Sequence, residues 1–64
     1  MDSGTFIAWQ SHMRFTSAEA ARQLGKSADT ISRYRRFGVP ESEALIVGLA
    51  CTAIAMKLPP WKQK

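Results

Sequence analysis

The chain has 64 residues, a formal net charge of +4 and a single cysteine, Cys51. A chain of this length forms one domain, residues 1–64, and so small a domain buries only about 60% of its unfolded surface, so pairing with a second copy is the expected source of extra stability. One cysteine excludes an internal disulfide, and one cysteine with one histidine is too small a ligand set for a structural zinc site. The first residues lack the basic and apolar regions of a secretory signal, so we expect a cytoplasmic location.

An amphipathic first helix is predicted over residues 3–13. Phe6, Trp9 and Met13 recur at helical spacing, and Asp2 or Ser3 can cap the start of the helix. An aromatic pair at this spacing is more typical of a core than of a ligand-binding surface. We therefore expect this helix to pack on the rest of the chain.

Two short helices joined by a tight turn are predicted over residues 16–37. Thr16 and Glu19 match a capping box, in which the Thr16 hydroxyl accepts from the Glu19 N–H and the Glu19 side chain reaches back to Thr16. Gly25 suits the left-handed stop of the first of these helices. Ser27 suits the N-cap of the second, with Asp29 in its positive first turn.

Basic residues gather in this helix pair. Six of the nine lysines and arginines lie between positions 14 and 36, where only Glu19 and Asp29 oppose them. Such a concentration favours a polyanionic partner, since each cation placed on a phosphate releases a counterion. From the charge alone, a solvated basic face explains the pattern equally well.

A fourth helix is predicted over residues 40–58, with Pro40 as its first residue and a stop before Pro59. No charged residue lies between Ala44 and Met56. This run is shorter than the roughly 20 apolar residues of a membrane span, so no membrane partner is expected. The apolar residues form two stripes, which are Leu45, Leu49 and Ala53 in one and Val47, Ile54 and Leu58 in the other.

One of these stripes can pack on the helix pair, and the other would stay exposed unless a second copy covers it. We therefore expect a homodimer through the fourth helix and the residues after it. The predicted dimer interface comprises Val47, Cys51, Ile54, Leu58 and Trp61. The ordinary alternative is a monomer whose first helix wraps both stripes.

The predicted helix pair has the spacing of a helix-turn-helix. Ala21 offers a small residue where the helices cross, Gly25 tolerates the turn, and Ile31 is a branched apolar residue that faces back. Leu24 and Tyr34 complete the shared core. The helical period then places Asp29, Ser32, Arg33 and Arg36 on the outer face.

With the aromatic first helix and the apolar helix that ends in LPPW, these residues resemble small phage-repressor-like helix-turn-helix regulators over Phe6 to Trp61. The resemblance implies an all-α, lambda-repressor-like fold of four to five helices, with the second helix of the pair in the major groove. The residues it implies at base edges are Ala28, Asp29, Ser32 and Arg33. The residues it implies at phosphates are Ser17, Lys26, Ser27 and Arg36.

We therefore expect a homodimeric, sequence-specific repressor that occupies an inverted-repeat operator in double-stranded DNA. The resemblance suggests a regulator of its own phage or mobile-element operon, such as an anti-CRISPR-associated one. Two alternatives stay open, which are an antitoxin or phage accessory protein whose apolar helix binds another protein, and a non-specific architectural DNA binder. Asp29 suits base contact and helix stabilisation equally. We see no acid, base and nucleophile in a catalytic pattern, so we expect no enzyme, cofactor, metal or small-molecule ligand.

Overall fold

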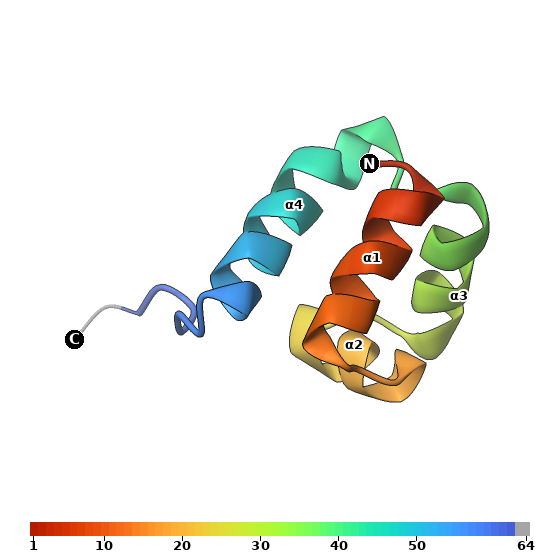
Figure 1. Ribbon diagram of the computed structural model, residues 1–64. Helices are drawn as coiled ribbons and strands as arrows, with labels where there is room; N and C mark the ends of the chain where they lie inside the picture. Colours follow the sequence, from red (N-terminus) through yellow and green to blue (C-terminus); the bar gives the residue numbers. More distant parts are fainter. Residues whose placement is uncertain (63–64) are drawn as a thin grey trace.

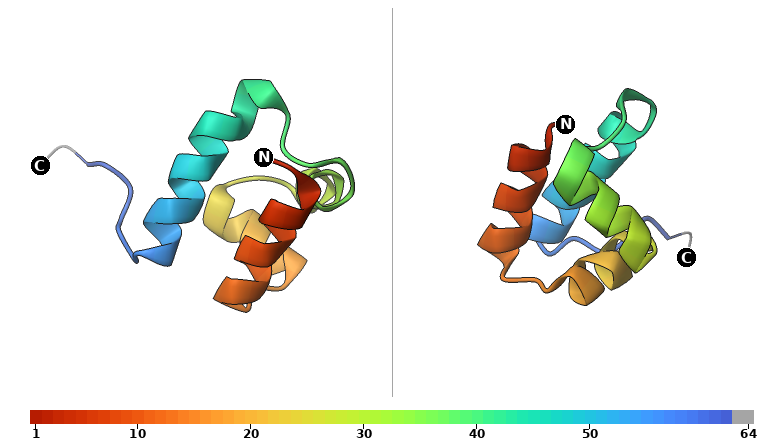
Figure 2. Two further views of the ribbon diagram at one scale, coloured as in Figure 1. Left: turned by 45° about the horizontal axis from the view of Figure 1, so that its top comes forward. Right: turned by 90° about the vertical axis from the view of Figure 1, so that its right-hand side faces the viewer.

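The computed structural model describes residues 1–62, and within them the chain is all-helical, as predicted (Figure 1). The helices are α1 (Ser3–Met13), α2 (Ser17–Leu24), α3 (Ala28–Phe37) and α4 (Glu41–Ala55). The main contacts join α1 to α3, α2 to α3 and α2 to α4. The chain that follows α4 runs away from the helices, as Figure 1 and the left view of Figure 2 show.

Side-chain caps begin the first three helices where the sequence predicted them. The Asp2 carboxylate accepts from the Thr5 N–H at 2.7 Å, and the Thr16 hydroxyl accepts from the Glu19 N–H at 3.1 Å. The predicted return contact of the capping box, from the Glu19 side chain to Thr16, is wrong. The Glu19 carboxylate turns to Arg22 and Gln23 instead of reaching back to Thr16, because both donors lie within one helical turn of it.

α4 is shorter than predicted at both ends. It begins at Glu41, with Pro40 just before it, and it ends at Ala55. Lys57 takes the left-handed conformation (φ 59°), and the Lys57 and Leu58 N–H groups turn back to the Ile54 and Ala53 carbonyls at 3.0 and 2.8 Å. This Schellman ending stops the helix before the prolines do.

The core lies where α1, α2 and α3 meet, and it continues along one side of α4. The Phe6 ring meets the Tyr34 ring edge-on, with 5.2 Å between centroids. The Trp9 indole N–H donates to the Cys51 carbonyl of α4 at 3.1 Å. The buried apolar residues are Phe6, Ala20, Ala21, Ile31, Tyr34, Val39, Val47 and Cys51.

The structure corrects the predicted dimer interface. Val47 and Cys51 are only 3% and 5% exposed in a single chain, so they belong to the core and offer no surface to a second copy. Ile54 is half-buried, whereas Leu58 and Trp61 are exposed. The side of α4 that faces solvent carries Leu45 and Leu49, which belong to the other predicted stripe. The sequence could not choose between the stripes because α4 is apolar on nearly every side.

The link between α3 and α4 is held against the start of the chain. Val39 N–H donates to the Met1 carbonyl at 2.8 Å. Gly38 has φ 87°, and a Cβ there would lie 2.7 Å from the same carbonyl, so only glycine fits. α3 and α4 meet at a bend of 108°. Within residues 1–62 no single helix is long and apolar enough to cross a membrane; this bent pair passes that test only by combined length and composition.

Candidate nucleic-acid interface

A three-residue link, Gly25 to Ser27, joins α2 to α3. Gly25 is left-handed (φ 67°), and its N–H and the Lys26 N–H return to the Arg22 and Ala21 carbonyls at 3.3 and 2.9 Å. The Ser27 hydroxyl then accepts from the Thr30 N–H at 3.2 Å and so starts α3. The link is therefore fully ordered by its own hydrogen bonds, as the sequence predicted for Gly25 and Ser27.

The inner side of the α2–α3 pair is apolar and closed. Ile31 is fully buried and Tyr34 is 2% exposed, while Ala21 is 7% exposed. Leu24 is half-buried against this core. Ala20, which the sequence analysis did not assign, is fully buried as well. These contacts fix which side of α3 faces solvent.

The outer side of α3 carries the residues that the resemblance places at base edges. Ala28, Asp29, Ser32 and Arg33 are all exposed. Arg33 Nη2 lies 3.4 Å from Thr30 Oγ1, which is a long and weak hydrogen bond. Among the residues that the structure describes, no hydrogen bond or ion pair holds the Asp29 carboxylate, which lies in the first turn of α3.

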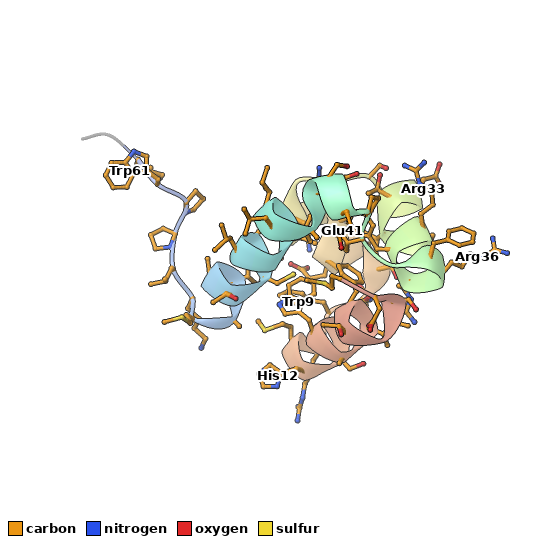
Figure 3. The ribbon with its side chains drawn as sticks, turned by 90° about the horizontal axis from the view of Figure 1, so that it is seen from above. Trp9, His12, Arg33, Arg36, Glu41 and Trp61 are labelled. Atoms are coloured by element: carbon orange, nitrogen blue, oxygen red, sulfur yellow. The ribbon has the colours of Figure 1, made fainter. Side chains whose placement is uncertain are left out.

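The four residues expected at phosphates have different surroundings. Arg36 is exposed and its guanidinium lies 5.6 Å from the Phe37 ring centroid, and Figure 3 shows Arg33 and Arg36 projecting from the same end of the molecule. Lys26 Nζ lies 3.9 Å from a Glu43 carboxylate oxygen. Ser27 is exposed, but its hydroxyl already caps α3. Ser17 is half-buried, with its hydroxyl 3.5 Å from the Gln10 amide nitrogen.

A buried glutamine, which the sequence analysis passed over, ties the helices behind this face. Gln10 is 4% exposed and its amide nitrogen donates to the Phe15 carbonyl at 3.1 Å. Arg35 Nη1 donates to the Gln10 side-chain oxygen at 2.9 Å. Arg35 is therefore a bridge from α3 to α1. The sequence did indicate that Gln10 is buried, because Gln10 lies four residues after Phe6 and shares its side of the helix.

Glu43 is an acidic residue in the first turn of α4, and its side chain contacts two residues outside that helix. The Tyr34 hydroxyl donates to Glu43 Oε1 at 2.6 Å, and Lys26 approaches the same oxygen. Burial, and then Glu43, raise the pKa of Tyr34 to about 12. Glu43 thereby joins α3 to α4 and offsets part of the positive charge beside the link.

The described residues hold no group of three or more His, Cys, Asp or Glu side chains that could bind a metal ion. Burial raises the pKa of the Cys51 thiol to about 11, so it stays protonated at neutral pH. The exposed cations of α3 and of the link before it are the part of this face that can attract an anionic ligand. No protein-family model, curated protein or solved structure matches the chain.

Proposed function

We propose that the chain is a sequence-specific transcriptional repressor that binds double-stranded DNA, with α2 and α3 as a helix-turn-helix. The observation that carries the proposal is that α3, which directly follows a three-residue link, has one buried side and one exposed, cationic side. Ile31 and Tyr34 are buried on one side, and Arg33 and Arg36 are exposed on the other. A helix held in this way can enter the major groove with its cations outward.

Within this proposal, Arg33 is the main reader of sequence. An arginine pairs with the O6 and N7 atoms of guanine through two hydrogen bonds, and the long contact to Thr30 is weak enough to be exchanged for them. Ala28, Asp29 and Ser32 lie on the same exposed surface and would meet the neighbouring base edges. The other candidates then fix the position of the helix on the duplex.

Phosphates would be met by Lys26, Ser27 and Arg36, together with Ser17 at the start of α2. Helix N-termini favour anions, and Ser17 and Ser27 lie at two of them. A phosphate at Lys26 would compete with Glu43, whose 3.9 Å separation from Nζ leaves a weak, exposed ion pair. Two copies related by a two-fold axis would place two α3 helices about 34 Å apart, and would bind an inverted repeat.

The test has two steps. Sites are first selected from a random duplex pool with the full chain, and the selected duplex is then titrated against a scrambled one at two salt concentrations. We expect selective binding that weakens steeply with salt. The double variant Arg33→Ala/Arg36→Ala should lose it. The matched control is Arg22→Ala, because Arg22 lies on α2 and is already paired with Glu19.

Two outcomes would overturn the proposal. Equal binding to both duplexes would indicate an architectural DNA binder, without sequence choice. An absence of binding at moderate salt would leave the alternative of an antitoxin or accessory protein. That alternative is supported by the exposed Leu45 and Leu49 on α4, a surface that could bind another protein.

A further inference from the structure

α4 and its C-cap residue Met56 together expose four large apolar side chains to solvent. Leu45, Ile46, Leu49 and Met56 are 75%, 71%, 63% and 64% exposed. Leu45, Leu49 and Met56 share one side of the helix, because they follow a spacing of four and then seven residues. We name these three residues the α4 ridge. Monomeric proteins rarely leave such a continuous apolar surface bare.

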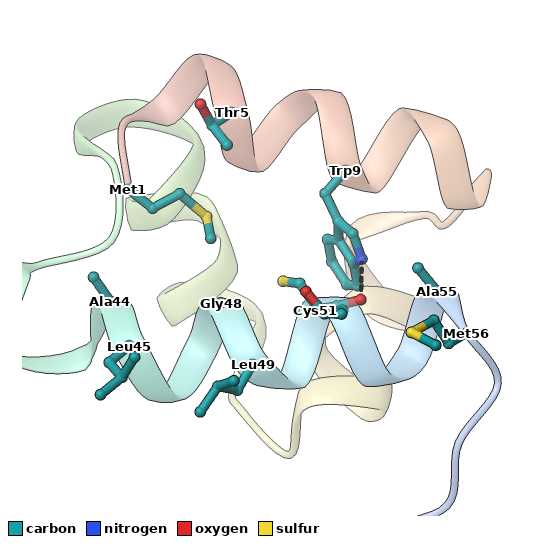
Figure 4. A pocket seen from close by; sticks show the side chains of 11 residues that line it. Met1, Thr5, Trp9, Ala44, Leu45, Gly48, Leu49, Cys51, Ala55 and Met56 are labelled. Carbon is teal, nitrogen blue, oxygen red and sulfur yellow. Dashed lines mark hydrogen bonds between the residues drawn. The ribbon is translucent and has the colours of Figure 1, made fainter.

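An apolar groove runs beside the ridge, between α1 and α4. It has a volume of about 570 Å³. Its α4 side includes the small residues Ala44, Gly48 and Ala55, Met1 and Trp9 lie across from them, and the three ridge residues line its edge. We name the first five of these residues the α1–α4 groove. Figure 4 shows Ala44 and Ala55 on the side of α4 that faces α1, and Leu45 and Leu49 turned away from it. The ridge therefore borders the groove without filling it.

We propose that a second copy of this chain covers this face, with the α4 ridge of each copy in the α1–α4 groove of the other. A two-fold interface uses the same patch twice, so that patch must contain both a protruding and a receiving half. Here the two halves adjoin on a single surface. A partner of different sequence would not require the ridge and the groove to complement each other.

Charge supports the same occupant. The chain carries a net charge of +4, yet neither the ridge nor the groove includes a charged side chain, and the Met1 ammonium at the end of the groove donates to the Val39 carbonyl at 3.5 Å. Two cationic chains can therefore meet along the ridge without lysine or arginine side chains opposed across the contact. Figure 3 shows Arg33 and Arg36 on α3, at the other end of the molecule from Trp61.

The expected interface is small. A large apolar side chain brings on the order of 100 Å² of surface, whereas a standard interface buries about 800 Å² per partner. We therefore expect a dimer that dissociates on dilution. This inference deepens the proposed function, because it names the face through which the two copies on an inverted repeat would meet. Its test uses no DNA, so a failure of the dimer is distinguishable from a failure of DNA binding.

The experiment is sedimentation equilibrium of the full chain over a wide concentration range. The mass should rise from 7.1 kDa toward twice that value as the concentration increases. Leu49→Glu should weaken self-association more than tenfold and leave the circular dichroism spectrum unchanged, because residue 49 is largely exposed. Phe37→Glu is the matched control, since Phe37 is 77% exposed on α3 and should leave the dimer intact.

A second variant tests the groove without adding charge. A Cβ at position 48 would lie 3.8 Å from the Met1 Cε atom, an ordinary contact, so Gly48→Ala should fold while narrowing the groove. We expect it to weaken the dimer as Leu49→Glu does. A wild-type chain that stays monomeric near 1 mM (roughly −4 kcal/mol) would overturn the inference. So would dimers that survive both changes but are lost in Trp61→Ala, which would place the contact in the tail.

Discussion

The α2–α3 pair and α4 use apolar residues differently. In α3, Ile31 and Tyr34 are buried while Arg33 and Arg36 are exposed, and Phe37 at the end of the helix is the large apolar residue left in solvent. α4 buries Val47 and Cys51 but leaves the equally apolar side chains of its ridge in solvent. A helix with one apolar side has one way to face a core.

The difference teaches where a pattern of residues is informative. For α3 the period alone separated the inner and outer sides. For α4 the same reasoning found two stripes and expected the one with Val47 to be exposed, whereas Val47 is buried, because both stripes satisfy the demand for apolar burial.

The largest effect is expected in the core of α3. Ile31→Ala removes a fully buried side chain and should cost about 2–5 kcal/mol of unfolding free energy. Leu45→Ala on α4 should cost less than about 0.5 kcal/mol in the dilute monomer, because Leu45 is 75% exposed. Urea unfolding at low protein concentration measures both. Similar losses would contradict the contrast between the two helices.

Each region buries one group that titrates at alkaline pH. The pKa of Tyr34 is raised from 10.0 to about 12, by burial and then by Glu43, and that of Cys51 from 9.0 to about 11 by burial. Folding favours the protonated form of both groups, so their contribution to the free energy of unfolding is fully present below the unfolded pKa values. It should be lost between pH 9 and 12, by on the order of 2 kcal/mol for each group.

Unfolding curves measured from pH 8 to pH 12 test this expectation, and Tyr34→Phe separates the two groups. This variant should keep the loss that begins near pH 9 and lack the one that continues to about pH 12. A wild-type stability that is flat across this range would show that neither buried group is linked to folding. Identical curves for the wild type and Tyr34→Phe would show that the titration of Tyr34 does not contribute to this loss of stability.

On the exposed side of α3, single variants should separate reading from anchoring. Arg33→Ala should cost about 1–3 kcal/mol of binding to the selected duplex and relax sequence choice at one position per half-site. Arg36→Ala should weaken all duplexes alike and reduce the salt slope by about 1. Fluorescence anisotropy at several salt concentrations measures both. A uniform loss in Arg33→Ala would reassign Arg33 to a phosphate.

The smallest effects are expected at the helix ends. Gly25→Ala should lower stability by about 1 kcal/mol, because a Cβ there meets nothing within 4 Å and only the left-handed φ of 67° opposes it. Lys57 takes φ 59° at the corresponding position after α4, so Lys57→Gly should raise stability by up to about 1 kcal/mol. Thermal unfolding compares them. Stability changes of the same sign in both variants would show that the left-handed φ does not determine stability at the ends of α2 and α4.

Local features of the fold were predictable from the sequence. Thr16, Gly25 and Ser27 mark helix boundaries through hydrogen bonds within a few residues, and all three act as predicted. The end of α4 was not predictable in this way. Lys57 carries no left-handed signal, so the prolines that follow it suggested a later stop.

The contacts behind the candidate site were predicted less well, since they join residues distant in sequence. Arg35 meets Gln10 across 25 positions, and Trp9 meets the Cys51 carbonyl across 42. Residue type alone gives Arg35 the same appearance as Arg33 or Arg36. Its pairing with α1 became visible only once the helices were packed.

The sequence by itself determined the four helices, the ordered link from Gly25 to Ser27, and the side of α3 that faces solvent. Each of these depends on local hydrogen bonding or on an unambiguous apolar period. Tertiary structure alone decided the facing of α4 and the close approach of Gly38 to Met1. The physical reason is the same in both cases: several arrangements satisfy the local chemistry, and packing against distant residues selects one.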